Sequence, residues 1–224
     1  METLLPNQER ARWAVISLWV NMCLALVLAG AQWWQAALIT SGEMTNESAE
    51  ESDSIVSLLA IIFLGSLIVS ATTFIMWFRR AYANLHRLDN VVILNHTEGW
   101  AAGAWFVPIL NLFRPFEIMK EIWWETQNNI PGKAERDGIQ GNELIGWWWG
   151  AWVTYNIVSR LTSRMSRSYD PDVVAFWLRA DALGSLLVVP AAILAVQVIQ
   201  RTNRFEQELY TTRRMSDPSE HLLA

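Results

Sequence analysis

Histidines and a row of glutamates are the side chains of this 224-residue chain best suited to chemistry. The histidines are His86, His96 and His221. A transmembrane b-type haem takes two histidines that face each other inside the bilayer, whereas His86 and His96 lie outside the apolar runs. Glu117, Glu121 and Glu125 recur at helical spacing and could bind a divalent cation, but such a row is more often a solvated helix face. The sequence therefore predicts no cofactor and no metal site.

Catalytic signatures are missing from the sequence. It contains no H-E-x-x-H, C-x-x-C, Walker A or G-x-S-x-G pattern, so we do not expect an enzyme. Cys23 is the single cysteine, which excludes a disulfide within the chain. The net charge of −5 and the lack of a long basic block give no reason to expect nucleic acid as a partner.

Small residues four positions apart occur in three places. The pairs are Gly99 with Gly103, Gly146 with Gly150, and Ser66 with Ser70. Such pairs let a second helix approach closely, and flanking indole rings can close over the contact. The pattern indicates tight helix packing and leaves open whether the second helix belongs to this chain or to a partner.

The last apolar segment carries Arg179 and Asp181 near its start and Pro190 at its middle. The two charges favour contact with headgroups at the outer interface. A buried pair used in transport is the alternative, because charge inside a bilayer is expensive and usually functional. Pro190 has no N–H to donate to the carbonyl of Leu186, so we expect a kink there.

Long uncharged runs define the elements that must position these side chains. Residues 55–78 form a 24-residue run and residues 13–39 a 27-residue run, with shorter ones of 19 and 16 residues over 182–200 and 144–159. About 20 apolar residues cross a bilayer as a helix, and these runs do not alternate as barrel strands would. We predict an all-α polytopic helical membrane protein with one domain over residues 1–204. Its four transmembrane helices would lie at about 12–39, 55–78, 144–161 and 172–200, and a polar cytoplasmic tail would follow over 205–224.

Residues 99–125 start as a membrane segment but do not continue as one. Trp100 to Phe113 pass without a charge, interrupted by Pro108 and Asn111, and charged residues follow. A helix of about 14 residues reaches roughly 21 Å, against a hydrocarbon core of about 30 Å. We predict a re-entrant segment that continues from Pro115 as an amphipathic surface helix. That helix would either anchor the protein on the leaflet or dock a partner.

Basic residues set the orientation in the membrane. Those that flank the first two spans are Arg10, Arg12, Arg79, Arg80 and Arg87. They place the N-terminus and the turn after the second span in the cytoplasm, and the acidic residues 40–54 in an outer loop. A re-entrant segment leaves three arginines outside, Arg160, Arg164 and Arg167, whereas a full crossing would put six other basic residues outside. We therefore expect both termini in the cytoplasm and Arg79, Arg80 and Arg87 at lipid headgroups.

Tryptophan is unusually frequent, with 14 copies. Many lie at the ends of the expected helices: Trp13, Trp33, Trp34, Trp77, Trp123, Trp124, Trp147 and Trp177. Indole rings are favoured at headgroup depth, so the sequence indicates an interface belt. An aromatic-lined pocket for a lipid or cofactor is the alternative.

Several uncommon residues follow one another in a fixed order between residues 77 and 148. They are Trp77-Phe-Arg-Arg-Ala81 with Asn84-Leu85, Gly99-Trp100, Trp105-Phe-Val-Pro-Ile109 with Asn111-Leu112, Arg114-Pro115, Glu121-Ile-Trp123 and Trp147-Trp148. In these residues the chain resembles a bacterial membrane family called domain of unknown function 4328 (DUF4328), over about residues 54–200. The resemblance implies a multi-helix protein of a bacterial inner membrane. It implies no activity, so the family-like residues Arg80, Asn84, Trp100, Trp105, Pro108, Asn111 and Pro115 are a signature segment only.

Two functions of different classes remain. The first is a non-catalytic membrane subunit that packs within and stabilises a larger complex, for example a respiratory or photosynthetic one. Its partners would be the lipid bilayer and other membrane protein subunits. The second is a small transporter or channel that acts as a homo-oligomer, because a broken segment with Pro108 and Asn111 resembles the elements that line substrate paths.

Overall fold

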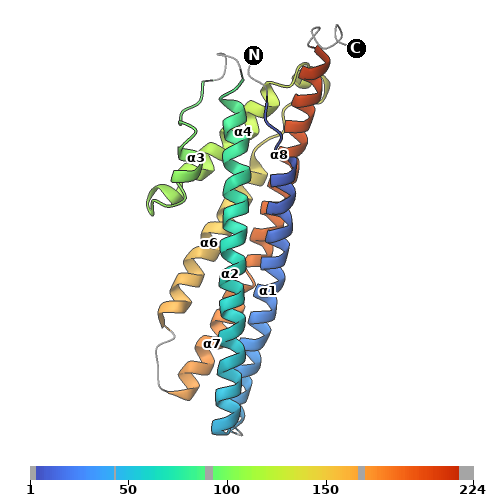
Figure 1. Cartoon of the computed structure of the whole chain (residues 1–224). Coiled ribbons are helices and arrows are strands. Elements are labelled where there is room, and N and C mark those ends of the chain that lie inside the picture. The colour runs from blue at the N-terminus through green and yellow to red at the C-terminus, as the bar shows by residue number, and fades with distance from the viewer. Residues whose placement is uncertain (1–3, 43, 89–92, 166–169, 217–224) are drawn as a thin grey trace. The chain divides into compact units, whose positions relative to one another are not determined.

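The computed structural model describes residues 4–42, 44–88, 93–165 and 170–216, whose regular structure is helical (Figure 1). The helices are α1 (Gln8–Ser41), α2 (Asn46–Leu85), α3 (Trp100–Gly103), η1 (Leu110–Leu112), α4 (Arg114–Asn128), α5 (Lys133–Arg136), α6 (Glu143–Met165), α7 (Pro171–Ser185) and α8 (Val188–Ser216). The chain divides into two compact units. We call Met1–Val15, Thr72–Trp147 and Val196–Ala224 the terminal unit, and Ile16–Ala71 and Trp148–Ala195 the central unit.

Three helices in the described part of the chain are long and apolar enough to cross a membrane. They are α1, α2 and the α7–α8 pair, taken together as Pro171–Arg214. The expectation of a helical membrane protein is therefore confirmed in these general terms. The fourth expected span, residues 144–161, falls in α6, whose tryptophans, Tyr155 and Asn156 make it less apolar than the other three. At 23 residues α6 is still long enough to reach across about 30 Å of hydrocarbon.

The helix α2 begins earlier than its apolar run. Most of the acidic stretch that we expected as an outer loop is helical, because α2 starts at Asn46. Thr45 and Ser48 form a reciprocal cap: the Ser48 N–H donates to Thr45 Oγ1 (3.2 Å), and the Thr45 N–H donates to Ser48 Oγ (2.9 Å). Glu47 in the first turn is also favoured by the positive end of the helix dipole. Only residues 42–45 connect α1 to α2.

Pro190 interrupts the last long helix. Because it cannot donate to the Leu186 carbonyl, α7 ends at Ser185 and α8 begins at Val188. The expected kink is thus a short break in the helix. Residues 205–216 of the expected tail belong to α8, while residues 217–224, including His221, lie outside the described residues, as does Arg167.

The core of the terminal unit is built from α2, α4 and α8. Its largest buried side chains include Trp77, Phe78, Tyr82, Ile118, Met119, Ile122, Trp123, Val198 and Ile199. The Trp123 indole N–H donates to the carbonyls of Gln140 (3.1 Å) and Gly141 (3.0 Å), and its ring packs edge-on against Phe205 at 5.1 Å. Trp77 and Trp123 are therefore core residues, which corrects their expected place in the interface belt.

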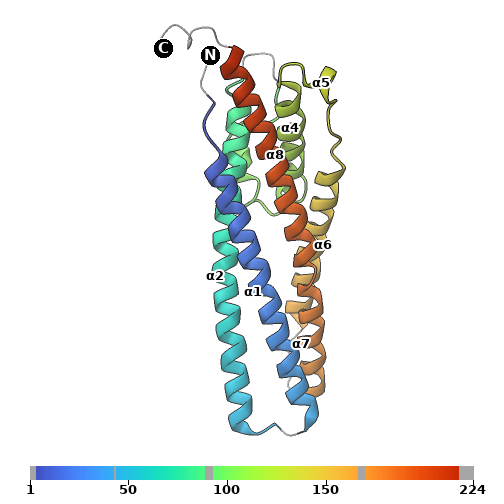
Figure 2. The ribbon, with the colours of Figure 1, turned by 90° about the vertical axis from the view of Figure 1, so that its right-hand side faces the viewer.

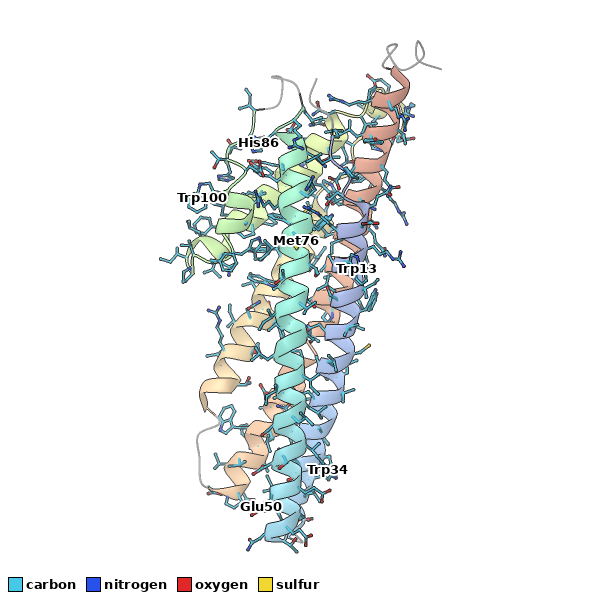
Figure 3. The ribbon with its side chains drawn as sticks, in the orientation of Figure 1. Trp13, Trp34, Glu50, Met76, His86 and Trp100 are labelled. Carbon is cyan, nitrogen blue, oxygen red and sulfur yellow. The ribbon has the colours of Figure 1, made fainter. Side chains whose placement is uncertain are left out.

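Other tryptophans do face outward as expected. Trp13 and Trp34 project from α1 (Figure 3), and Trp33 and Trp147 are also exposed. An indole ring has an apolar body and one N–H donor, which is why exposed indole rings are favoured at headgroup depth in membrane proteins.

Segment 99–125 is not one helix. It consists of α3, a run of turns, η1 and then α4, and Phe106 and Ile109 in the turns are exposed. Pro115 occupies the first turn of α4, as expected. The apolar face of α4 is buried within the terminal unit, however, so its amphipathic pattern reflects packing against this chain. That corrects the expectation of a face free to anchor on the leaflet or to dock a partner.

The central unit is tied together by polar side chains between apolar helices. Ser66 on α2 donates to Asn21 Oδ1 on α1 (2.8 Å), and Ser70 Oγ donates to the Ser17 carbonyl (2.8 Å). On α7, which lies beside α1 (Figure 2), Asp181 accepts from the Gln32 amide of α1 (2.8 Å). These bonds satisfy polar groups that would be costly in an apolar environment.

Candidate functional site

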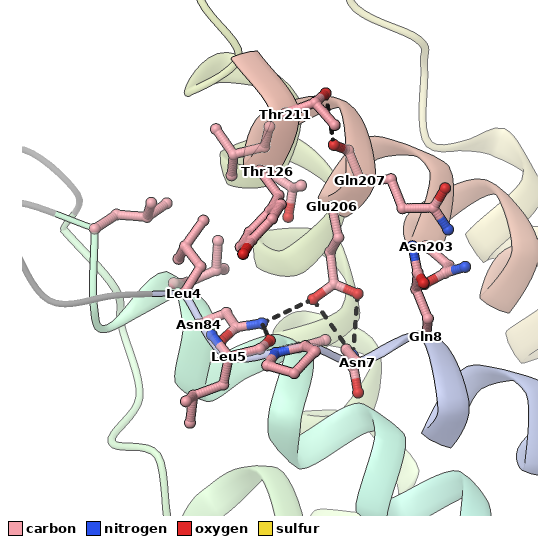
Figure 4. A pocket seen from close by; sticks show the side chains of 16 residues that line it. Leu4, Leu5, Asn7, Gln8, Asn84, Thr126, Asn203, Glu206, Gln207 and Thr211 are labelled. Carbon is pink, nitrogen blue, oxygen red and sulfur yellow. Dashed lines mark hydrogen bonds between the residues drawn. The ribbon is translucent and has the colours of Figure 1, made fainter. Parts of the chain in front are cut away.

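The carboxyl group of Glu206 faces two side-chain amides in the terminal unit (Figure 4). Glu206, on α8, accepts hydrogen bonds from Asn7 Nδ2 at both oxygens (3.3 and 3.0 Å) and from Asn84 Nδ2 (3.3 Å). Asn7 lies directly before α1, and Asn84 lies in the last turn of α2. We call these three residues the carboxyl–amide cluster.

Asn84 also fixes the N-terminal segment. Its Oδ1 accepts from the Leu5 N–H (3.0 Å), and its Nδ2 donates to the Leu5 carbonyl (2.9 Å). One side-chain amide therefore satisfies both backbone groups of a residue outside any helix. Asn7 Nδ2 adds a bond to the Trp77 carbonyl (3.3 Å), which ties the same segment to α2.

The protonation of Glu206 is shifted by its surroundings. The residue lies beyond Arg201 and Arg204, about 9 Å along the helix from the end of the apolar run at Gln200. Burial raises the pKa of Glu206 to about 7, and the hydrogen bonds from Asn7 and Asn84 offset part of that rise. The carboxyl is therefore close to half-protonated near neutral pH.

A cavity of about 230 Å³ adjoins the carboxyl–amide cluster. Leucines 4, 5, 85, 88 and 209 make most of its wall apolar, and Thr126 and Tyr210 add hydroxyls. A single carboxyl in such a cavity can hold a proton or a hydrogen-bond donor. It has no nucleophile–base arrangement beside it in the described lining, and nowhere in the described residues do three or more His, Cys, Asp or Glu gather as metal ligands.

A second cluster connects α2, α4 and the segment before α3. The Tyr82 hydroxyl donates to Glu121 Oε2 (2.6 Å), and Asn95 Nδ2 donates to Glu121 Oε1 (2.8 Å). His96 Nε2 lies 3.2 Å from Glu117 Oε2. Burial and the neighbouring Glu121 raise the pKa of Glu125. The glutamate row expected as a solvated face is thus partly used to hold α4 on α2.

The three arginines expected at lipid headgroups lie around one cavity together with a fourth arginine. Arg79, Arg80 and Arg87 on α2 line a cavity of about 340 Å³, and Arg10 on α1 lines it as well. Arg10 Nη1 donates to the Met76 carbonyl (3.4 Å), and Arg79 forms an ion pair with Glu98 (3.3 Å). We call this the arginine cavity.

Arg179 and Asp181, for which a buried pair was the alternative to headgroup contact, bind different partners. Asp181 accepts from Gln32 (2.8 Å) and Thr162 Oγ1 (2.7 Å), whereas Arg179 donates to Thr40 Oγ1 (2.9 Å). A cavity of about 50 Å³ lined by Tyr155 and Asp181 adjoins this polar group in the central unit. Asp181 is thereby bound inside the unit, and Arg179 lies near the end of α1.

The small-residue pairs fall into two groups. Ser66 and Ser70 are used within the chain, through the bonds to α1 described above. A Cβ added at Gly99, Gly146 or Gly150 would meet no atom within 4 Å, and one at Gly103 would meet only the Trp100 ring at 3.8 Å. The glycine pairs therefore do not bring two helices of the described chain into close contact.

The signature residues are spread over the terminal unit. Trp105 packs edge-on against Phe74 (5.5 Å) and Phe78 (5.8 Å), and the Arg114 guanidinium lies 4.2 Å above the Trp100 ring. Pro108 is exposed and Asn111 is half-buried in the turns before α4. Of this segment only Asn84 belongs to the carboxyl–amide cluster. The sequence does not single out its partners Asn7 and Glu206, because no motif marks an isolated Asn or a Glu at the polar end of a helix.

Comparison with known proteins gives one match. No curated protein and no solved structure matches the chain. Residues 40–204 match the family described as domain of unknown function (DUF4328). The match takes in α2 to α7, most of α8 and the whole signature segment, and it ends two residues before Glu206. The chain belongs to the DUF4328 family.

Proposed function

We propose that the chain is a non-catalytic integral membrane subunit that packs within and stabilises a larger complex of the bacterial cytoplasmic membrane. The observation that carries this proposal is an uncovered face along α6. Its exposed residues are Gly146, Gly150, Thr154, Ile157 and Leu161, which recur at steps of four, four, three and four. Such steps place all five on one side of a helix.

The shape of this face favours a protein helix over lipid as its cover. Two glycines and a threonine leave a flat surface on which another backbone can lie closely. The exposed Trp147 indole stands next to the first glycine and can close over the contact. By contrast, α2 is covered with large aliphatic side chains, and only 6% of its apolar window is buried, as suits contact with acyl chains.

The terminal unit supports an even number of membrane crossings. Asn7 precedes the first span and Glu206 follows the last, yet the two side chains are hydrogen-bonded, so both lie on the same side. Three crossings would put them on opposite sides. A crossing by α6 supplies the fourth, and it agrees with the four spans that we expected.

The same reasoning supports a position of segment 99–125 on one side of the membrane. Asn84 comes before it and Lys133 after it, and Lys133 Nζ pairs with Glu208 Oε2 (2.6 Å) near the end of α8. In the proposed topology the segment begins and ends on the side of the termini, and the basic residues favour the cytoplasm as that side. The proposed topology has four spans, with α3 to α5 on the cytoplasmic side.

Native electrophoresis of membranes in a mild detergent tests the subunit proposal. We expect the chain to migrate in an assembly larger than its own 25.6 kDa, and Gly150→Leu to release it as a monomer. Gly30→Leu on α1 is the matched control, because Gly30 is equally open but has Leu26 and Trp34 four residues away. A wild-type chain that remains monodisperse and monomeric in every mild detergent contradicts the proposal.

A homo-oligomeric transporter or channel is the second candidate, and Asp181 favours it. This carboxyl lies within a predicted span beside a small cavity, and ionisable groups there commonly mark a path for ions or substrates. Proteoliposomes would show solute or proton flux that Asp181→Asn abolishes and Asp172→Asn, at the exposed start of α7, leaves intact. An assembly made of this chain alone would also point to this candidate.

A further inference from the structure

The arginine cavity has the composition of a phosphate site. Four guanidinium groups line it, and Glu98, the acidic side chain among its described lining residues, is paired with Arg79. Guanidinium groups present forked N–H donors that match the oxygens of a phosphate. Four like charges around about 340 Å³ repel one another, so a bound anion would relieve that repulsion.

The cavity lies at the ends of the uncharged runs of α1 and α2, next to charged residues. The uncharged run of α2 ends at Phe78, directly before Arg79, and the run of α1 begins at Trp13, three residues after Arg10. Met76 and Trp13, both labelled in Figure 3, are largely exposed. Met76 also lines the cavity, together with Leu5 and Ala83. A ligand in the cavity would therefore have an anionic end among arginines and apolar surface beside it.

We propose that the arginine cavity binds the phosphate of an anionic phospholipid headgroup. The acyl chains would follow the exposed apolar surface of α1 and α2 away from the charges. A general attraction of basic residues to the cytoplasmic leaflet needs no cavity and no particular arginine. The proposal differs from it in requiring Arg10 and Arg80 in particular, because they come from two helices and enclose the same space.

Thermal unfolding of the purified full-length chain in a neutral detergent, with added lipid, tests the site. We expect phosphatidylglycerol to raise the unfolding temperature of the wild type at concentrations where phosphatidylcholine does not. The double variant Arg10→Gln/Arg80→Gln should need roughly 25-fold more phosphatidylglycerol for half the effect, since each arginine near anionic lipid is worth about a fivefold change. The control Arg201→Gln/Arg204→Gln removes the same charge next to the end of another apolar run and should change the requirement less than twofold.

A second measurement keeps the test independent of how well the double variant folds. Arg80→Lys retains the charge but loses the fork, and we expect an intermediate loss. Native mass spectrometry of the wild type should retain one phosphatidylglycerol in preference to phosphatidylcholine.

The other outcomes overturn the proposal in different ways. If millimolar inorganic phosphate or glycerol phosphate gives the full shift, the cavity binds soluble phosphate and the lipid source is wrong. If both double variants lose the effect equally, or if no lipid is retained, the attraction is diffuse and the cavity is no binding site.

Discussion

Glu206 is the residue whose chemistry depends most on its surroundings. Its carboxyl accepts hydrogen bonds from the side-chain amides of Asn7 and Asn84, and burial raises its pKa to about 7. The folded protein therefore holds this proton more tightly than the unfolded chain, in which the pKa is close to 4.5. The stabilising contribution of the group is complete below about pH 4.5 and is lost as the pH rises through 7.

Glu206→Gln tests this linkage. The amide resembles the protonated carboxyl, so the variant should lose the pH dependence and be more stable than the wild type at pH 8, by up to about 3 kcal/mol. Thermal unfolding in detergent between pH 5 and pH 8 measures the difference. Glu135→Gln, at an exposed position of α5, should follow the wild-type curve. An unchanged pH slope in Glu206→Gln would show that another group is responsible.

The sequence indicated one member of the carboxyl–amide cluster and not the others. Asn84 is part of the family signature, so its position could be singled out, but its partners could not. Asn7 and Glu206 are separated by 199 residues, and each is surrounded by ordinary polar residues. Only the fold brings them together, because the helices that connect them return to the same unit.

At the scale of elements, uncharged runs predicted the three long apolar helices but not where these helices begin and end. A run of apolar residues reports which part of a helix avoids water, not where its hydrogen bonds stop. The start of α2 depends on Thr45 and Ser48, and the break before α8 on Pro190, which the sequence did reveal. The prediction that the apolar face of α4 is free for the leaflet or a partner was wrong, because burial in a protein and contact with a leaflet produce the same pattern.

Gly184 on α7 gives a test of helix contact in the central unit. A Cβ at this position would lie 3.0 Å from Val158 Cγ1 of α6. We expect Gly184→Ala to destabilise the protein by about 1 kcal/mol, because the Val158 side chain must shift by a few tenths of an ångström to admit the methyl group. Gly30→Ala is the control: nothing lies within 4 Å of its added methyl group, so it should be neutral or stabilise α1 by up to about 1 kcal/mol. The unfolding temperature in detergent compares the two variants, and equal effects would refute the contact.

At the scale of the whole molecule, the proposed topology predicts which introduced cysteines can be labelled from outside the cell. In a Cys23→Ala background, single cysteines at Glu50 and Asp172 should react with an impermeant maleimide from outside the cell. Cysteines at Glu9 and Glu135 should react only after the membrane is opened. All four positions are exposed in the structure, so a cysteine that fails to react is shielded by the membrane and is not buried within the protein. Reaction of the Glu135 position from outside would mean that segment 99–125 crosses the bilayer.

The hydrogen bond between Asn7 and Glu206 has a consequence for biosynthesis. Because Asn7 and Glu206 are 199 residues apart, the amide of Asn7 can meet its carboxyl partner only after α8 has been made. Until then the N-terminal segment lacks the bond that joins it to α8, so this part of the terminal unit closes only late in synthesis.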